Sequence, residues 1–183
     1  MLAESDRIVI GYHGTSVESA AVILGGGAFR LSQNDYDWLG HGVYFWEYAP
    51  YRAREWAIGK HGPDAAVVEA KIRLGRCLDL TDIRYTEVIR QAFDGLREAY
   101  AKRGSTMPVN RGKARRLDCL VINYVAEYVL PECETVRAPF LEGSPIFDGS
   151  ALLSASHVQI VIRRPTTTIT GIRIVDTWGD DKR

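Results

Sequence analysis

Apolar residues recur along the chain with two different periods, and these periods separate candidate strands from candidate helices. Runs rich in β-branched and aromatic residues, which are typical of strands, occupy residues 7–12, 43–45, 65–74, 77–80, 157–164 and 167–175. Helical spacing of apolar residues is found at residues 16–24, 50–57, 89–100 and 117–128. This order predicts an α+β fold in which strands begin and end the chain and helices fill its middle.

Local signals mark where the helices begin and end. Ser16 is suited to cap the first helix, and three glycines at residues 25–27 end it. Pro50 stands at the first position of the second helix, where its missing N–H has no consequence. We expect one domain over residues 1–183, with a helical insertion at about 81–130 packed against the sheet.

Composition excludes several classes of function. The 23 basic and 23 acidic residues leave no net charge to attract nucleic acid or a membrane, so any such attraction must be local. The three cysteines are too few and too widely spaced for a disulfide scaffold or a thiolate metal motif, and the four histidines share no metal-ligand spacing. Without a secretory leader or an uninterrupted apolar segment, we expect a cytoplasmic protein with no bound metal and no membrane partner.

Three short motifs stand out because the common phosphate-binding, dinucleotide and metalloprotease motifs are absent. The first strand ends on "YHGT" at residues 12–15, and "GHGVYF" follows at residues 40–45. On the late strand, alternation predicts that Ile160 and Ile162 share one face while His157 and Gln159 share the other. The polar pair therefore faces something other than an apolar core.

In order and position, these motifs resemble the diphtheria-toxin and poly(ADP-ribose) polymerase class of ADP-ribosyltransferases. Members of that class surround NAD with a His-Gly pair, a tyrosine in a Gly-x-Gly-x-Tyr-Phe stretch and a glutamate on a late strand. The chain is most similar to small bacterial transferase domains of toxin and phage-defence systems. The resemblance implies a split antiparallel β-sheet core with flanking helices, and NAD as the co-substrate.

The resemblance also assigns the NAD-binding residues of the first two motifs. His13 would bond a hydroxyl of the adenosine ribose, and Gly14 and Thr15 would bring the backbone close to the nicotinamide amide, an approach that a side chain at position 14 would block. Tyr44 would stack on one side of the nicotinamide ring and Trp56 on the other. Ala53 stands where the family often has a serine that bonds the amide.

The third motif departs from the family, because Gln159 stands where the catalytic glutamate is expected. A glutamine keeps a hydrogen bond to the ribose but loses the negative charge that stabilises the transition state. Glu142, in the loop before this strand, is the candidate for the missing carboxylate, and Asp148 is its nearest competitor. His157 could bond the acceptor or act as a base.

The segment from Lys102 to Arg116 contains six basic residues and no acid. Such a local charge attracts phosphates, either of NAD or of a nucleic-acid acceptor. We expect four of these residues to bind the acceptor: Arg111, Lys113, Arg115 and Arg116.

The sequence thus predicts a mono-ADP-ribosyltransferase that modifies a protein or nucleic acid, as a toxin or defence effector with a neutralising antitoxin as a further partner. The alternatives are a catalytically weak module that binds NAD or ADP-ribose, and an NAD glycohydrolase that uses water as acceptor. Each motif also has a plain structural interpretation: a strand-end turn, core aromatic packing, or solvated polar residues.

Overall fold

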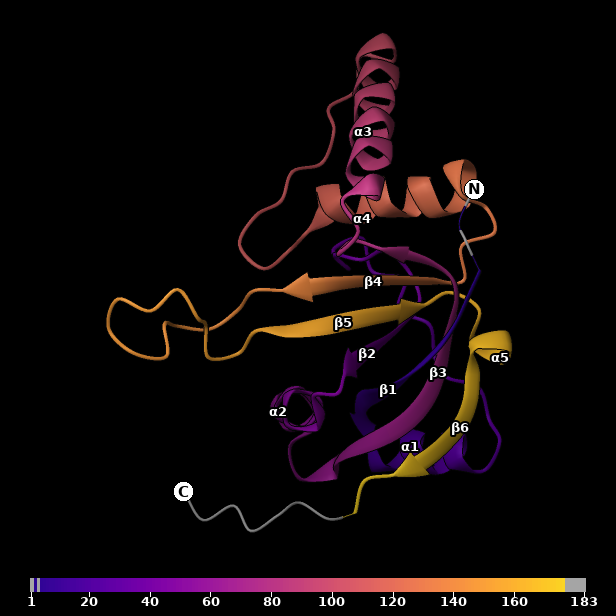
Figure 1. Cartoon of the computed structure of the whole chain (residues 1–183), viewed down its shortest axis with the longest axis vertical. Coiled ribbons are helices and arrows are strands. Elements are labelled where there is room, and N and C mark those ends of the chain that lie inside the picture. Colours follow the sequence, from indigo (N-terminus) through magenta and orange to yellow (C-terminus); the bar gives the residue numbers. More distant parts are fainter. Residues whose placement is uncertain (1, 3, 177–183) are drawn as a thin grey trace.

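The computed structural model describes residue 2 and residues 4–176, in which strands begin and end the chain and helices occupy much of its middle, as predicted (Figure 1). The strands are β1 (Glu4–Ser16), β2 (Val43–Glu47), β3 (Ala65–Asp79), β4 (Thr135–Phe140), β5 (His157–Ile162) and β6 (Ile169–Ile174). The helices are α1 (Val17–Leu24), α2 (Pro50–His61), α3 (Arg84–Lys102), α4 (Arg116–Tyr124) and α5 (Pro165–Thr168), with a 3-10 turn η1 (Gly62–Asp64) and a π-helical turn η2 (Val125–Val129). The fold is therefore mixed α+β, as the sequence predicts.

Local signals placed the boundaries of α1 and the start of α2. The Ser16 side chain accepts a hydrogen bond from the Ser19 N–H and so caps α1, and Pro50 opens α2. The two predicted strands at 65–74 and 77–80 form one strand, β3, because Gly75, with a φ of 58°, carries the chain through a bend without ending it. No helix within residues 4–176 is both long enough and apolar enough to cross a membrane.

The sheet closes on itself, which the sequence did not predict. Its strands follow the order β1-β2-β5-β4-β3-β6, and an additional long antiparallel pairing joins β1 to β3. Five strands therefore form a closed ring, and β6 is added outside it on β3. The expected split antiparallel sheet differs from this arrangement in a second respect, because β3 and β4 are parallel across the connection that contains α3 and α4.

Closure gives every strand an inner and an outer face. The inner face is filled by a small apolar core in which Phe45 and Ile160 are fully buried, together with Val9 and Ile72. Gly11 is required here, because a Cβ on it would lie 2.4 Å from the Ile72 side chain. Ile160 and Ile162 belong to this core and Val161 to the opposite one, which confirms the predicted alternation of the late strand.

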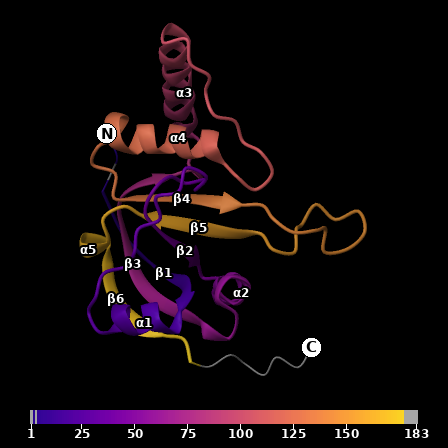
Figure 2. The same cartoon turned by 180° about the vertical axis from the view of Figure 1, so that it is seen from behind.

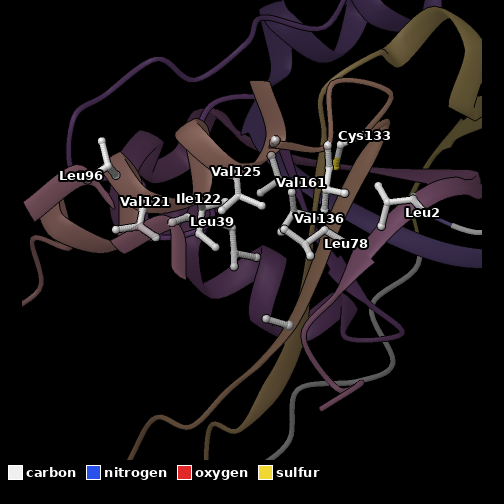
Figure 3. Packing of buried hydrophobic residues seen from close by; sticks show 14 residues of the cluster. Leu2, Leu39, Leu78, Leu96, Val121, Ile122, Val125, Cys133, Val136 and Val161 are labelled. Carbon is white, nitrogen blue, oxygen red and sulfur yellow. The ribbon is translucent and has the colours of Figure 1, made fainter. Parts of the chain in front are cut away.

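The outer face of β4 and β5 carries the larger core (Figure 3). Val136 and Val161 point from these strands toward apolar side chains of α4 and η2, including Val121 and Val125. Helix α3 adds Leu96 to this core, yet most of its length projects away from the sheet in both views (Figures 1 and 2). In the sequence these helices come between β3 and β4, and in the structure they cover one end of the outer face.

Strand β4 was missed by the sequence analysis, because its sequence "TVRAPF" contains an arginine and a proline. Arg137 is nonetheless only 8% exposed on the inner face, where its guanidinium donates to Glu47 on β2 at 3.0 Å and to Asp79 on β3 at 3.1 Å. Both carboxylates satisfy the buried charge, which would otherwise be very costly. The pair raises the pKa of Arg137 above its ordinary value, chiefly through the hydrogen bond to Glu47.

Helix α2 covers the end of β1 and explains Gly14 without a ligand. A Cβ at position 14 would lie 2.5 Å from the Ala53 carbonyl oxygen and 3.1 Å from the Trp56 ring. Ala53 and Ala57 are fully buried at this contact, as their small size allows. The glycine of the first motif is thus fixed by the close approach of a helix.

We expect Gly14→Ala to lower the free energy of unfolding by about 1–3 kcal/mol, because the α2 backbone must move to admit the new methyl group. Gly59→Ala is the matched control on α2 itself, where a Cβ would meet nothing within 4 Å. That control should be neutral or stabilising by up to about 1 kcal/mol. Urea denaturation of both variants measures the difference, and equal stabilities would contradict the packing account of Gly14.

Candidate functional site

Gln159 lies at the centre of a group of polar and aromatic side chains on the outer face of the sheet. It is paired across the strands with Trp46 on β2 and with Ala138 on β4. Trp46 packs under α2, whereas Ala138 belongs to the core under α4 and η2. Gln159 therefore occupies the boundary between two covered regions, where strand register alone brings the second and third motifs side by side.

A chain of hydrogen bonds passes through the Gln159 amide. The Trp38 indole Nε1–H donates to Gln159 Oε1 at 2.6 Å, and Gln159 Nε2 lies 3.0 Å from His157 Nε2. His157 Nδ1 lies 2.7 Å from the carbonyl oxygen of Ala155. Both side chains of the predicted polar pair are thus held within the protein.

Aromatic rings surround this chain. The Phe140 ring lies 4.7 Å from Trp38 and 5.4 Å from His157, measured between ring centroids. The Trp46 ring lies 6.4 Å from His157 and 5.8 Å from Trp56. We call Trp38, Trp46, Phe140, His157 and Gln159 the Gln159 cluster.

An ion pair borders the Gln159 cluster. Arg52 on α2 donates to Glu142 at 2.6 Å and also pairs with Glu55 one helical turn along. Burial lowers the pKa of His157 below its ordinary value; the Arg52 charge acts in the same direction and the Glu142 charge opposes it. The lowered pKa favours the neutral form of the ring, and Glu142 lies close enough to influence that pKa.

Two buried N–H donors near the cluster have no hydrogen-bond partner: Trp46 Nε1 and Arg52 Nε. Trp46 is only 6% exposed. A buried donor left unsatisfied costs about 1–3 kcal/mol. Both donor atoms are enclosed by the protein itself.

His13 lies on the other side of the sheet from the Gln159 cluster. Its ring contacts Phe29 and Phe45 at centroid distances of 5.5 and 5.4 Å, and Phe45 belongs to the inner core. Its Nδ1 lies 2.9 Å from the Tyr44 main-chain oxygen. Burial is the main cause that lowers the pKa of His13. His13 thus bonds the second motif's backbone, and its ring is not brought together with Gln159.

Tyr44 points to the outer face but is engaged by the loop before β2. Its hydroxyl donates to the Gly40 carbonyl at 2.9 Å and accepts from the Leu39 N–H at 3.1 Å, and its ring packs against the larger core. Burial raises the pKa of Tyr44 well above its ordinary value. This tyrosine fixes the shape of the "LGHG" loop.

The remaining predicted NAD contacts differ in exposure. Trp56 is 42% exposed and Lys60 Nζ lies 4.6 Å above its ring, so one face of the indole is already covered. Ala53 is fully buried under Trp46 and offers no surface to a ligand. Thr15 is 8% exposed, in the stretch of β1 paired with β3.

The basic segment approaches the Gln159 cluster through the loop that contains Trp38. The Arg115 N–H donates to the Tyr36 carbonyl at 3.3 Å, and Arg116 pairs with Asp35 at 2.8 Å. Arg111 and Lys113 are exposed. Two of the four predicted acceptor residues therefore hold this loop in place, and the other two present their charges to solvent.

Sequence reasoning missed Trp38, Arg52 and Phe140. A tryptophan beside the second motif was a usable signal for Trp38, since an indole N–H needs an acceptor when it is buried. Arg52 carried no such signal, because its partner Glu142 is far away in sequence. Within residue 2 and residues 4–176, no group of three or more His, Cys, Asp or Glu side chains is arranged to hold a metal ion.

The lowered pKa of His13 predicts a dependence of stability on pH. The unfolded chain takes up a proton near pH 6.5, whereas the folded protein takes it up only at a lower pH, so the free energy of unfolding should decrease as the pH falls from 7 to 5. Each full proton contributes a slope of about 1.4 kcal/mol per pH unit. His13→Asn keeps a donor for the Tyr44 carbonyl and should reduce this slope.

Urea denaturation of both proteins at pH 8 and pH 5.5 tests this dependence. The difference at pH 8 reports packing and hydrogen bonding alone, because the imidazole is neutral in both states there. An identical decrease between the two pH values in both proteins would show that His13 is not the group that takes up the proton.

Comparison with known proteins adds no family assignment. No family model matches the chain, and no curated protein matches it significantly. The functional conclusion therefore depends on the geometry of the Gln159 cluster and on the motifs that predicted it.

Proposed function

We propose that the chain is an NAD-dependent mono-ADP-ribosyltransferase with an ADP-ribosyltransferase fold. The observation that carries this proposal is the register of β2 and β5, which sets Trp46 directly opposite Gln159. The three strands that bear the three motifs, β1, β2 and β5, are consecutive neighbours in the sheet. The second and third motifs thus lie side by side on the outer face, while His13 of the first motif supports them from the inner face.

The chemistry of the Gln159 cluster suits a nicotinamide nucleotide. Trp56, beside the cluster, is 42% exposed, so its ring offers a stacking surface for a flat cationic ring. Gln159 can bond a ribose hydroxyl, and the Arg52 guanidinium holds Glu142 near that position.

In the proposed reaction the bond between C1′ of the ribose and the nicotinamide nitrogen breaks, and the nicotinamide leaves with the bonding electrons. A nucleophilic atom of the acceptor then bonds C1′ and loses its proton to solvent or to a nearby base. The Glu142 carboxylate would stabilise the positive charge that develops on the ribose. A correctly placed charge of this kind is worth about 2.7–4 kcal/mol.

Tyr44 and His13 take different roles from those that the family resemblance implies. The Tyr44 hydroxyl holds the loop before β2, and His13 bonds the backbone of Tyr44 from the inner face. We propose that both residues position the second motif, whereas the exposed face of Trp56 supplies a stacking surface. A macromolecular acceptor would meet the exposed charges of Arg111 and Lys113; a toxin or defence role with an antitoxin partner, in the cytoplasm, belongs to the same proposal.

A second candidate function is a module that binds NAD or ADP-ribose with little catalysis. The specific observation in its favour is that Arg52 neutralises Glu142, while Gln159 is itself uncharged. Hydrolysis with water as acceptor is the third outcome, since it uses the same cleavage step.

Nicotinamide release from NAD, measured with and without cell lysate, separates these functions. Release that requires lysate supports transfer, and release without lysate supports the glycohydrolase. Binding of NAD with no release supports the module, and no binding at all would refute the proposal. Labelled NAD incubated with separated protein and nucleic-acid fractions then identifies the class of acceptor.

Glu142→Gln should lower the turnover of NAD about 100- to 1000-fold with little change in NAD affinity, because the lost charge acts mainly in the transition state. Glu55→Gln is the matched control, since Glu55 pairs with the same Arg52 on the exposed side of α2. Its turnover should stay within about twofold of the parent protein. Equal losses in both variants would assign the effect to Arg52 rather than to the Glu142 carboxylate.

Neutralising Arg111 and Lys113 together should reduce transfer to a nucleic-acid acceptor while NAD hydrolysis stays nearly intact. The two exposed charges lie in the segment that holds the Trp38 loop, and phosphate contacts of this kind weaken steeply with salt. The slope of transfer against salt concentration should therefore become shallower in the double variant. Equal loss of hydrolysis and transfer would place these charges on the NAD diphosphate instead.

A further inference from the structure

The Trp38 indole determines how the Gln159 amide is oriented. An indole nitrogen is a donor only, so the atom 2.6 Å from Trp38 Nε1 must be the amide oxygen. The amide NH₂ then necessarily faces His157 Nε2 at 3.0 Å. The orientation thus follows from the chemistry of the indole.

The same chain of bonds determines the protonation of His157. An amide NH₂ can only donate here, so His157 Nε2 must be unprotonated and accept. The Ala155 carbonyl can only accept, so His157 Nδ1 carries the hydrogen, consistent with their separation of 2.7 Å. The bonds are satisfied together only by a neutral imidazole with its hydrogen on Nδ1.

We propose that Trp38 is a positioning residue that locks the Gln159 amide and thereby keeps His157 neutral in its Nδ1–H form. In this state Gln159 has one N–H and one oxygen lone pair left for a ligand, which suits a hydroxyl that both accepts and donates. His157 is then a support for Gln159 and not a base, because its lone pair is occupied. The consequence for NAD chemistry rests on the proposed function, but the orientation of the amide does not.

Charged groups face His157 from two neighbouring elements. Arg52 approaches from α2 and Glu142 from the loop after β4, and their charges act on the imidazole in opposite directions. The other neighbours of the ring, Trp46 and Phe140, carry no charge. The hydrogen bond from Gln159 and the burial of the ring therefore both disfavour protonation of His157 at Nε2.

The fixed orientation of the Gln159 side chain also determines how a glutamate at position 159 would behave. A carboxylate in place of the Gln159 amide would still accept from Trp38, but its second oxygen would face the lone pair of His157 Nε2. Uptake of a proton by His157 converts this repulsion into an ion pair. Gln159→Glu should therefore yield a carboxylate paired with a charged imidazole, and the variant need not gain the activity that a free acid would provide.

Nitrogen-15 NMR of the His157 ring tests the lock without any substrate. In the parent protein we expect one neutral tautomer with the hydrogen on Nδ1 and a pKa below the ordinary value of about 6.5. In Trp38→Phe the amide can turn, so its oxygen can accept from a protonated Nε2, and the pKa of His157 should rise by about 0.5–1. Phe140→Leu is the control, because Phe140 contacts both rings without donating to Gln159.

Equal pKa values for His157 in the parent protein and Trp38→Phe would overturn the lock, as would the same rise in Phe140→Leu. Should Trp38→Phe fail to fold, Gln159→Glu gives an independent answer. There the pKa of His157 should rise by about 1–3, the effect of an adjacent opposite charge. An unchanged His157 pKa in that variant would also refute the proposal.

Nicotinamide release by the same variants separates this inference from the proposed function. Where the parent protein turns over NAD, Trp38→Phe should lower kcat and add a dependence on His157 protonation to the pH profile, and Phe140→Leu should not add one. NMR results that support the lock in a protein that neither binds nor cleaves NAD would refute the proposed function alone. The reverse combination, turnover of NAD by the parent protein and an unchanged pKa of His157 in Trp38→Phe, would refute the role of Trp38 alone.

Discussion

Pairing of β1 with β3 is the constraint on which the rest of the structure depends. It closes five strands into a ring, so that successive residues of each strand point to separate environments. The inner space is small. It contains apolar side chains, the close approach of Gly11 to Ile72, and the ion pairs of Arg137. Every remaining outward residue must be covered by a helix or meet solvent.

Two sets of helices provide that cover, and the candidate site lies between them. Helix α2 packs on Gly14 and Trp46, while α4 and η2 pack on Val136 and Val161. Gln159 lies at the boundary, where neither set covers it fully. Polar side chains are partly buried there with defined partners, as the bonds from Trp38 to Gln159 and from Gln159 to His157 show. The distribution of the helices over the ring thus explains why the Gln159 cluster lies at this position.

The buried arginine on β4 illustrates how one ion-pair network sustains this architecture. Arg137 bonds Glu47 and Asp79, so a single side chain joins β4 to both β2 and β3 across the inner face. Removing Arg137 would take from the buried Glu47 carboxylate its buried cation, and an uncompensated buried charge commonly costs about 3–5 kcal/mol. The register that sets Trp46 opposite Gln159 is supported by this link, because Glu47 is the neighbour of Trp46 on β2.

The sequence by itself determined five of the six strands, the Ser16 and Pro50 boundaries and the faces of β5, because these depend on local capping and on the two-residue period of a strand. It also singled out Gln159, His157 and Glu142, since chemistry-bearing residues stand out from an apolar background. Only the tertiary structure decided ring closure, strand β4, the separation of His13 from Gln159, and the partners Trp38 and Arg52. Those features arise from contacts between residues far apart in the chain. Such contacts produce no periodic pattern of residues from which the sequence alone could predict them.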